Sequence, residues 1–253
     1  MDMDGEDLPA VDERLVAPGS RYEIIDGLVT YVPPALPPHA LRHSKVSALV
    51  EAHAHADYQV ASDMLTRTSR IDDLAPDVSV YARAPHPSNG GRQLEVLAFQ
   101  VMASESPGRA TTKARKLSER GVRRVFAIDV TRNRALEWSR ELGTWSVLDV
   151  DGSIADPALA VALPIDALLN AANTDEPVAR ALLAKRVPVL EAARAADRLT
   201  ERRDSVIEIL RARGIAIDPE QRTRLEAEVD PARVGRWISV AATCTNAGEL
   251  FGV

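Results

Sequence analysis

The sequence predicts an α/β protein in which a mixed sheet is flanked by helices and followed by an all-helical C-terminal appendage. Short β-rich runs, many of them bounded by Gly- and Pro-containing turns, recur through residues 21–150. One strand–helix–strand unit at residues 94–130 interrupts this hairpin order, and such a unit implies parallel strands within the sheet. From about residue 175 the composition changes to Ala, Arg, Leu and Glu, which favours helices.

The composition predicts a soluble protein of a reducing cytoplasm. The 253 residues are 45% apolar and 27% charged, as is ordinary for a soluble chain with a core. No apolar run approaches the ~18 residues of a transmembrane helix, so we expect no membrane association. The acidic N-terminus lacks the basic start and apolar centre of a signal peptide. The single cysteine, Cys244, excludes an intramolecular disulfide and a cysteine-built zinc site.

The charge distribution gives a mixed indication about nucleic acid. A net charge of −6 argues against a protein that coats DNA or RNA, although a local basic patch can oppose the whole-chain charge. Basic residues do cluster between residues 109 and 134. The plainer interpretation of this cluster is a set of solvated helix and loop side chains. Its members are Arg115, Lys116, Arg120, Arg123, Arg124, Arg132 and Arg134.

The expected elements of the first part follow in order along the chain. Residues 1–20 are polar, contain two prolines and predict a loose lead-in. Residues 21–32 predict a hairpin, because Asp26-Gly27 joins two β-rich runs. A proline-rich loop then precedes a helix at about residues 39–56. The remaining expectations are strands at 58–61, 65–70, 77–81, 94–102 and 122–130, a helix at 109–120, and a hairpin of 135–138 with 144–150. These elements form one expected domain, residues 21–174.

The C-terminal region, residues 175–253, is predicted to be helical throughout. A helix at about 189–213 stops at Gly214, and Asp218-Pro219 and Asp230-Pro231 each start a further helix. An apolar stripe of Leu199, Val206, Ile209 and Leu210 predicts packing on a neighbouring helix or on a second copy. No helix-turn-helix signature is evident, and the protein partner of these helices is unknown.

Three residues on neighbouring elements predict phosphodiester chemistry. Asp77 begins a strand, Gln100 lies in the next core strand, and Lys113 lies on the following helix. Two acids in such positions hold a hard cation, and a lysine orients the attacking water or neutralises charge on the phosphate. Here an amide replaces the second acid. It can coordinate a cation weakly but brings no negative charge.

The segment from Tyr22 to Trp138 resembles the Uma2 family of restriction-type endonucleases, within the PD-(D/E)XK nuclease superfamily. The matching pieces, in order, are Tyr22-Glu23-Ile24-Ile25-Asp26-Gly27, Ala75-Pro76-Asp77-Val78-Ser79-Val80, Leu97-Ala98-Phe99-Gln100-Val101, Lys113-Ala114-Arg115-Lys116-Leu117, Gly121 to Ile128, and Leu136-Glu137-Trp138. Each piece alone is weak, but their order and spacing over more than 110 residues are specific. The resemblance implies a restriction-endonuclease-like fold.

The resemblance also implies roles for individual residues. Asp77 would bind the metal, Gln100 would occupy the second acid position as a weak ligand, and Lys113 would be the helix-borne lysine, with Lys116 in reserve. The cofactor implied is Mg²⁺ or Mn²⁺, bound weakly because the family pattern has a glutamate where this chain has Gln100. Glu95 is a poor substitute, since it faces the other side of a regular strand from Gln100. Glu105 could reach the site from the strand's end.

The glutamine leaves three interpretations open: a natural inactive binder, a weak nuclease rescued by another acid, and an introduced substitution. Correspondingly, the chain is either a metal-dependent endonuclease acting on DNA or a nuclease-fold scaffold that binds nucleic acid or protein. A third hypothesis is a structural dimer in which the C-terminal helices matter most. The resemblance implies a homodimer, which suits cleavage of two-fold symmetric DNA.

Other candidates for chemistry are weaker. His39 and His43 are four residues apart on a predicted helix, as are Glu51 and His55, and this spacing suits metal ligands. Without a His-Glu-x-x-His motif, we expect these histidines on a polar helix surface. Trp138 and Trp145 are expected to be packing residues. No Walker loop, Gly-x-Ser-x-Gly elbow or Gly-x-Gly-x-x-Gly run is present.

Overall fold

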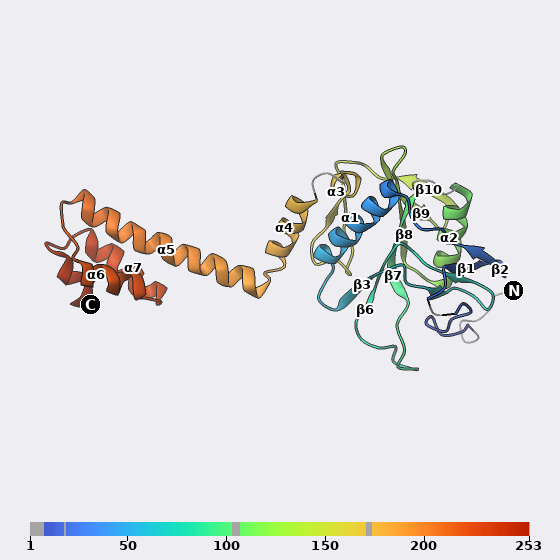
Figure 1. The fold of residues 1–253 in the computed structure, drawn as a ribbon, viewed down its shortest axis with the longest axis horizontal. Helices are drawn as coiled ribbons and strands as arrows, with labels where there is room; N and C mark the ends of the chain where they lie inside the picture. The colour runs from blue at the N-terminus through green and yellow to red at the C-terminus, as the bar shows by residue number, and fades with distance from the viewer. Residues whose placement is uncertain (1–7, 18, 103–106, 171–173, 253) are drawn as a thin grey trace. The chain divides into compact units, whose positions relative to one another are not determined.

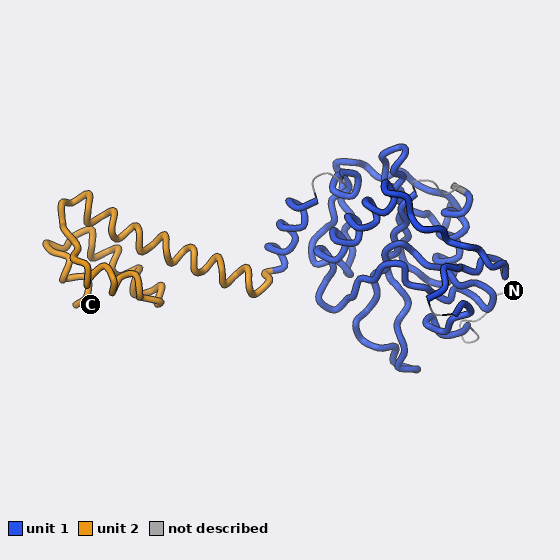
Figure 2. Tube along the Cα trace, in the orientation of Figure 1, with its two compact units in different colours: residues 1–185 blue, residues 186–253 orange. Residues whose placement is uncertain are grey.

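The computed structural model describes residues 8–17, 19–102, 107–170 and 174–252. The chain divides into two compact units, residues 1–185 and residues 186–253 (Figure 2). We describe each unit by itself. Among the described residues, no helix combines the length and the apolar character that crossing a membrane requires.

A six-stranded mixed sheet forms the centre of the first unit. Its strand order is β10-β9-β8-β7-β6-β3. Only β7 and β8 among these strands are parallel, and all the other neighbours are antiparallel. The bounds are β3 Tyr58–Ser62, β6 Val78–Ala82, β7 Glu95–Met102, β8 Arg124–Asp129, β9 Arg134–Ser139 and β10 Thr144–Val147.

Two helices cover the two faces of this sheet (Figure 1). α1 (Pro37–His53) packs Val46, Leu49 and Val50 against one face, where the Phe99 and Phe126 rings stack at 5.0 Å between centroids. α2 (Pro107–Arg120) covers the alternate residues of the same strands, among them Ala98 on β7 and Ala127 on β8. Because side chains of a strand alternate in direction, each strand of this sheet contributes to both layers.

A smaller four-stranded sheet, in the order β2-β1-β5-β4, lies within the same unit. The hairpin of β1 (Tyr22–Ile25) and β2 (Leu28–Tyr31) turns at Asp26 and Gly27, both with positive φ. The other strands are β4 (Thr66–Arg67) and β5 (Asp73–Leu74). The Asp73 carboxylate accepts hydrogen bonds from the backbone N–H groups of Leu15 and Val16. Residues 8–17 are therefore held against this sheet, although the composition suggests a loose lead-in.

The first unit ends with β11 (Ser153–Ile154), β12 (Leu163–Pro164), α3 (Ile165–Leu169) and α4 (Asp175–Ala184). α3 contributes Leu168 to the core beneath α1, and α4 packs against α1. The expected boundaries at residues 20 and 174 stay predictions. The break between the compact units falls after Lys185, because α4 makes its contacts with α1.

The second unit has its own helices and its own core. It comprises α5 (Pro188–Ala212), α6 (Pro219–Ala227), α7 (Pro231–Ala241) and the 3-10 helix η2 (Ala247–Gly252). Val206, Leu210 and Trp237 are at most 2% exposed within that core. Asp218 and Asp230 cap α6 and α7 as the sequence predicts, and Gly214 follows α5 with φ +71°.

These observations confirm the predicted fold class, a mixed α/β sheet flanked by helices with C-terminal helices after it. The predicted hairpin at residues 21–32 and the strand–helix–strand unit at 94–130 are both present. The first helix starts two residues earlier than expected, at Pro37, because proline is tolerated in the first turn.

Candidate active site

One pocket of about 1030 Å³ in the first unit gathers the ionisable residues of interest. Four parts of the chain line it: the β1–β2 hairpin with the loop after it, α1, the residues before β4 and β6, and α2. The ionisable side chains that matter for chemistry are Glu23, His39, His43, Asp63, Asp77, Arg109 and Lys113.

Asp77 precedes β6, and two contacts fix its carboxylate. Its Oδ2 accepts a hydrogen bond from the backbone N–H of Val101 at 2.6 Å, and its Oδ1 lies 3.3 Å from His39 Nε2. Burial would raise the pKa of Asp77, but the His39 hydrogen bond, the charge of Lys113 and the Val101 N–H together hold that pKa below its usual value. The carboxylate is therefore ionised at neutral pH, and 20% of its side-chain surface remains exposed.

His39 and His43 of α1 face this aspartate, which corrects the expectation that they lie on a polar helix surface. Their side chains are 17% and 18% exposed. His43 Nε2 lies 2.6 Å from the backbone oxygen of Asp77, and a carbonyl oxygen only accepts, so this nitrogen carries a proton. The spacing of four residues places both rings on the pocket side of α1. His55, by contrast, is exposed and lies beside Asp57.

Lys113 of α2 reaches the same pocket through a buried ion pair that the sequence did not predict. Its ammonium lies 2.7 Å from Glu23 Oε1 and donates to the carbonyl oxygen of Ala75 at 3.1 Å. Arg109 pairs with the second Glu23 oxygen at 2.7 Å. Glu23 also accepts the backbone N–H of Ala75, which fixes the chain two residues before Asp77. Glu23 thus links the hairpin, α2 and the segment before β6 that contains Asp77.

Gln100 is a backbone neighbour of Asp77 but does not line this pocket among the described residues. Val78 pairs with Phe99, so one further step of the antiparallel register places Asp77 opposite Gln100. Strand alternation puts Gln100 on the α2 face, with Ala98 and Met102. Gln100 is only 2% exposed. Within the described part of the chain, neither its amide oxygen nor its amide nitrogen has a hydrogen-bond partner. A buried amide without a partner is costly.

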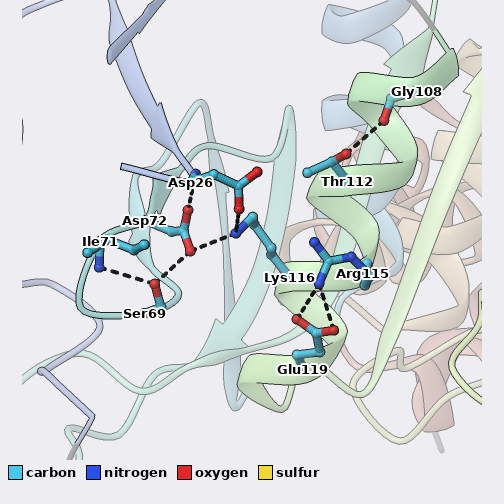
Figure 3. Close-up of polar contacts among 9 residues, drawn as sticks. All are labelled: Asp26, Ser69, Ile71, Asp72, Gly108, Thr112, Arg115, Lys116 and Glu119. Atoms are coloured by element: carbon cyan, nitrogen blue, oxygen red, sulfur yellow. Dashed lines mark hydrogen bonds and ion pairs between the residues drawn. The ribbon is translucent and has the colours of Figure 1, made fainter. Parts of the chain in front are cut away.

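Lys116 points into a separate cluster (Figure 3). Its ammonium lies 2.7 Å from Asp26 Oδ1 and 2.8 Å from Asp72 Oδ2. Asp72 also accepts from the Ser69 hydroxyl and from the backbone N–H of Asp26. Burial opposes the charge on Lys116, but the two carboxylates raise its pKa above the usual value. The Lys116 ammonium therefore contacts two carboxylates, and through Asp26 it connects α2 to the hairpin turn.

The arginine cluster noted in the sequence is paired internally for the most part. The exposed pair Arg115–Glu119 lies on α2, and Arg124 contacts Glu137 through two nitrogens. Further pairs join Arg123 to Asp156, and both Arg132 and Arg134 to Asp129. These acids neutralise much of the charge of the cluster, although Arg120 donates to the backbone oxygen of Pro9 and Asp129 serves two arginines.

A divalent cation has candidate ligands at one point of the pocket. Ligand atoms of His43, Asp63 and Asp77 lie within 4.8 Å of one another. Two of these residues supply carboxylate oxygens, which hard cations prefer. His43 would have to release the backbone oxygen of Asp77 before its Nε2 could bind a metal. Asp77 and Asp63 are therefore the better ligands in the arrangement seen here.

The structure brings together two of the three predicted site residues, Asp77 and Lys113. Glu95 lies away from the pocket in an ion pair with Arg92 at 3.0 Å, and Glu105 lies outside the described residues. Glu23 and Asp63 were missed as functional candidates, and His39 and His43 were recognised for their spacing but assigned to a polar helix surface. The signal for Glu23 was present: it is the one acid among Tyr22-Glu23-Ile24-Ile25, and alternation turns it inward.

A comparison with models of protein families identifies one family. The model of the Uma2 family, described as "Putative restriction endonuclease", matches residues 6–168. Among solved structures, a putative nuclease of DUF820 from Anabaena variabilis ATCC 29413 is similar, with 16% identity and a TM-score of 0.49 over 58% of this chain and 89% of that chain. Comparison with curated proteins gives no match.

Proposed function

The chain belongs to the Uma2 family, and from this premise we propose that its first unit hydrolyses DNA phosphodiester bonds with the help of Mg²⁺ or Mn²⁺. One observation supports the proposal above the others: an ionised carboxylate, Asp77, and a lysine, Lys113, line the same pocket. This pair is the minimum that metal-assisted attack on a phosphate requires.

The residues present fit a hard cation. Asp77 keeps its charge and part of its surface in the pocket, and Asp63 adds a second carboxylate close by. The amide oxygen of Gln100, on the neighbouring strand, has no hydrogen-bond partner among the described residues, but Gln100 lies outside the pocket lining, so Asp77 and Asp63 are the ligands of this proposal. When bound, the cation would polarise the phosphate and lower the pKa of a bound water.

The protein's own side chains then have separate tasks. Lys113 neutralises charge on the phosphate oxygens, and Arg109 adds a second positive group beside it. Glu23 positions both side chains, because its Oε1 pairs with the Lys113 ammonium and its Oε2 pairs with the Arg109 guanidinium. His39 and the Val101 N–H orient the Asp77 carboxylate.

A second candidate function is a binding protein that keeps the nuclease fold without its activity. Two features favour it: Gln100 brings no charge to the second acid position, and Lys113 is already neutralised by Glu23. A cation held by fewer charges binds more weakly. This alternative predicts association with nucleic acid or a protein partner without cleavage.

Nicking of supercoiled plasmid DNA by the full chain, with Mg²⁺ or Mn²⁺ and with EDTA as control, tests the proposal. We expect metal-dependent nicking that Asp77→Asn abolishes. Asp57→Asn is the matched control, because Asp57 is 82% exposed and lies outside the pocket. No nicking by the wild-type chain with either ion would overturn the nuclease proposal. DNA binding without cleavage would then support the binding protein.

A further inference from the structure

The pocket around Asp77 has two different kinds of wall. The acids and bases described above form one part of its lining, and an unbroken segment of five apolar residues, 32–36, forms another. This segment connects β2 to α1 and includes Pro33, Pro34 and Leu36. Tyr22 lines the pocket as well. A phosphate needs only the polar part, so the apolar part indicates a further substrate group without charge.

The exposed fractions of the side chains describe a recess with an accessible rim. Lys113 and Glu23 are 8% and 3% exposed, and Asp77 is 20% exposed. Tyr22 and Leu36, by comparison, are 44% and 65% exposed. The accessible part of the lining therefore includes apolar side chains, Tyr22 and Leu36, together with the carboxylate of Asp63, whose side chain is 72% exposed. The available volume, about 1030 Å³, is of the size that encloses a small organic ligand, typically ~300–1,000 Å³.

The two forms of DNA differ in their ability to enter such a recess. Duplex DNA is stiff, with a persistence length of about 150 base pairs, so a single phosphate cannot leave the helix without distortion. Its bases are also stacked inside and cannot reach an apolar wall. An unpaired strand bends at every nucleotide and exposes the face of each base, which stacks on aromatic side chains.

We propose that this pocket takes unpaired DNA, either a single strand or the unpaired arm of a fork. The backbone phosphate meets Lys113 and Arg109, and a neighbouring base contacts Tyr22 and the wall of residues 32–36. This inference rests on the proposed nuclease function. It departs from the expectation of two-fold symmetric duplex sites that a restriction-type enzyme raises.

The first experiment compares substrates of one sequence: single-stranded, forked and blunt duplex oligonucleotides, incubated with the full chain and Mn²⁺. We expect the unpaired DNA to be cut at least ~5-fold faster than the duplex, since stacking of one base contributes a factor of roughly 5 to 100. Cleavage of the blunt duplex at an equal or higher rate would overturn the inference and leave the nuclease function standing. If no DNA is cut, the nuclease proposal fails, and anisotropy binding of the same oligonucleotides decides the substrate form: equal affinities overturn the inference.

A matched pair of tyrosines identifies the surface involved. Tyr22 and Tyr31 are cross-strand partners in the hairpin with ring centroids 5.8 Å apart, and only Tyr22 of the two lines the pocket among the described residues. We expect Tyr22→Leu to weaken binding of single-stranded DNA by roughly 5- to 100-fold, as loss of one stacked base would. Tyr31→Leu should leave binding unchanged. Equal losses in both variants, with equal thermal stability, would contradict the assignment.

Discussion

Two lysines of α2, one turn apart, perform different tasks in this protein. Lys113 pairs with Glu23 and lines the pocket that contains Asp77. Lys116 pairs with Asp26 and Asp72 in a cluster that has no part in lining the pocket (Figure 3). Both are at most 9% exposed, so burial does not distinguish them. The two lysines differ in the surroundings of their ion pairs. The Lys113–Glu23 pair lines the pocket, whereas Lys116 pairs with Asp26 and Asp72 at the hairpin turn, away from the pocket lining.

Under the proposed function, α2 serves both the stability of the fold and the chemistry of the pocket. The Lys116 cluster fixes the turn of the hairpin, and the same hairpin carries Glu23 three residues earlier. Lys116 therefore holds the hairpin that positions Lys113 and Arg109, without contact to the pocket. Activity should depend on Lys113, and folding should depend more on Lys116.

The largest expected effect is on stability. Lys116→Ala leaves Asp72, 4% exposed, as a buried carboxylate without its cation, and breaking a buried pair in this way typically costs about 3–5 kcal/mol. Urea unfolding followed by circular dichroism measures the change. Arg115→Ala is the control on the same helix, because the Arg115–Glu119 pair is about half exposed and should contribute less than ~1 kcal/mol. Equal losses in the two variants would refute a structural role for Lys116.

The next effect is on catalysis. Lys113→Ala should lower the rate of Mn²⁺-dependent cleavage by about 10²–10³-fold, the usual cost of removing one group that stabilises transition-state charge. Its unfolding free energy should fall by less than that of Lys116→Ala, since Glu23 keeps Arg109 and the Ala75 N–H as partners. Single-turnover rates on a common oligonucleotide measure the loss. A variant that cleaves at the wild-type rate would remove Lys113 from the mechanism.

The sequence predicted the local elements and two of the residues that line the pocket. Asp26-Gly27 marks the hairpin, and Gly121 and Gly214 mark helix ends, because turns depend on a few neighbouring residues. Asp77 and Lys113 followed from family spacing. The two lysines could not be told apart, because their partners lie far away in sequence: Asp72 is 44 residues from Lys116.

The same reason explains the missed residues. Arg109 and Glu23 are separated by 86 residues, and His43 and the Asp77 carbonyl by 34. The four-residue spacing of His39 and His43 predicts that both lie on one face of the helix, but it does not predict which strand that face will contact. Gln100 was recognised from spacing as the departure from the family pattern, but its exclusion from the pocket depends on how β7 packs beneath α2.

A smaller effect is expected at the second acid position. Gln100→Glu adds a carboxylate on the strand opposite Asp77 and should raise the Mn²⁺ affinity by roughly 10-fold, about 1.4 kcal/mol. Isothermal titration calorimetry measures the affinity. Gln59→Glu adds the same charge on β3 and keeps an oxygen that accepts from Tyr81, so it should leave the affinity unchanged. The same affinity in both variants would place position 100 outside the metal site.

The smallest effect contrasts the pH responses of the two clusters. The pKa of Asp77 is depressed, so cation binding is present above that pKa and lost as the pH falls through it. His39→Ala removes a hydrogen bond that lowers this pKa, so the acid limb of Mn²⁺ binding should move to higher pH. The acid limb of stability should move less than that of binding, because Asp77 contributes only part of it and Asp72 keeps its own lowered pKa through Lys116, Ser69 and the Asp26 N–H. His55→Ala, an exposed histidine beside Asp57, should change neither limb. Mn²⁺ titrations and urea unfolding between pH 3 and pH 7 separate these responses, and an unmoved binding limb in His39→Ala would show that His39 does not position Asp77.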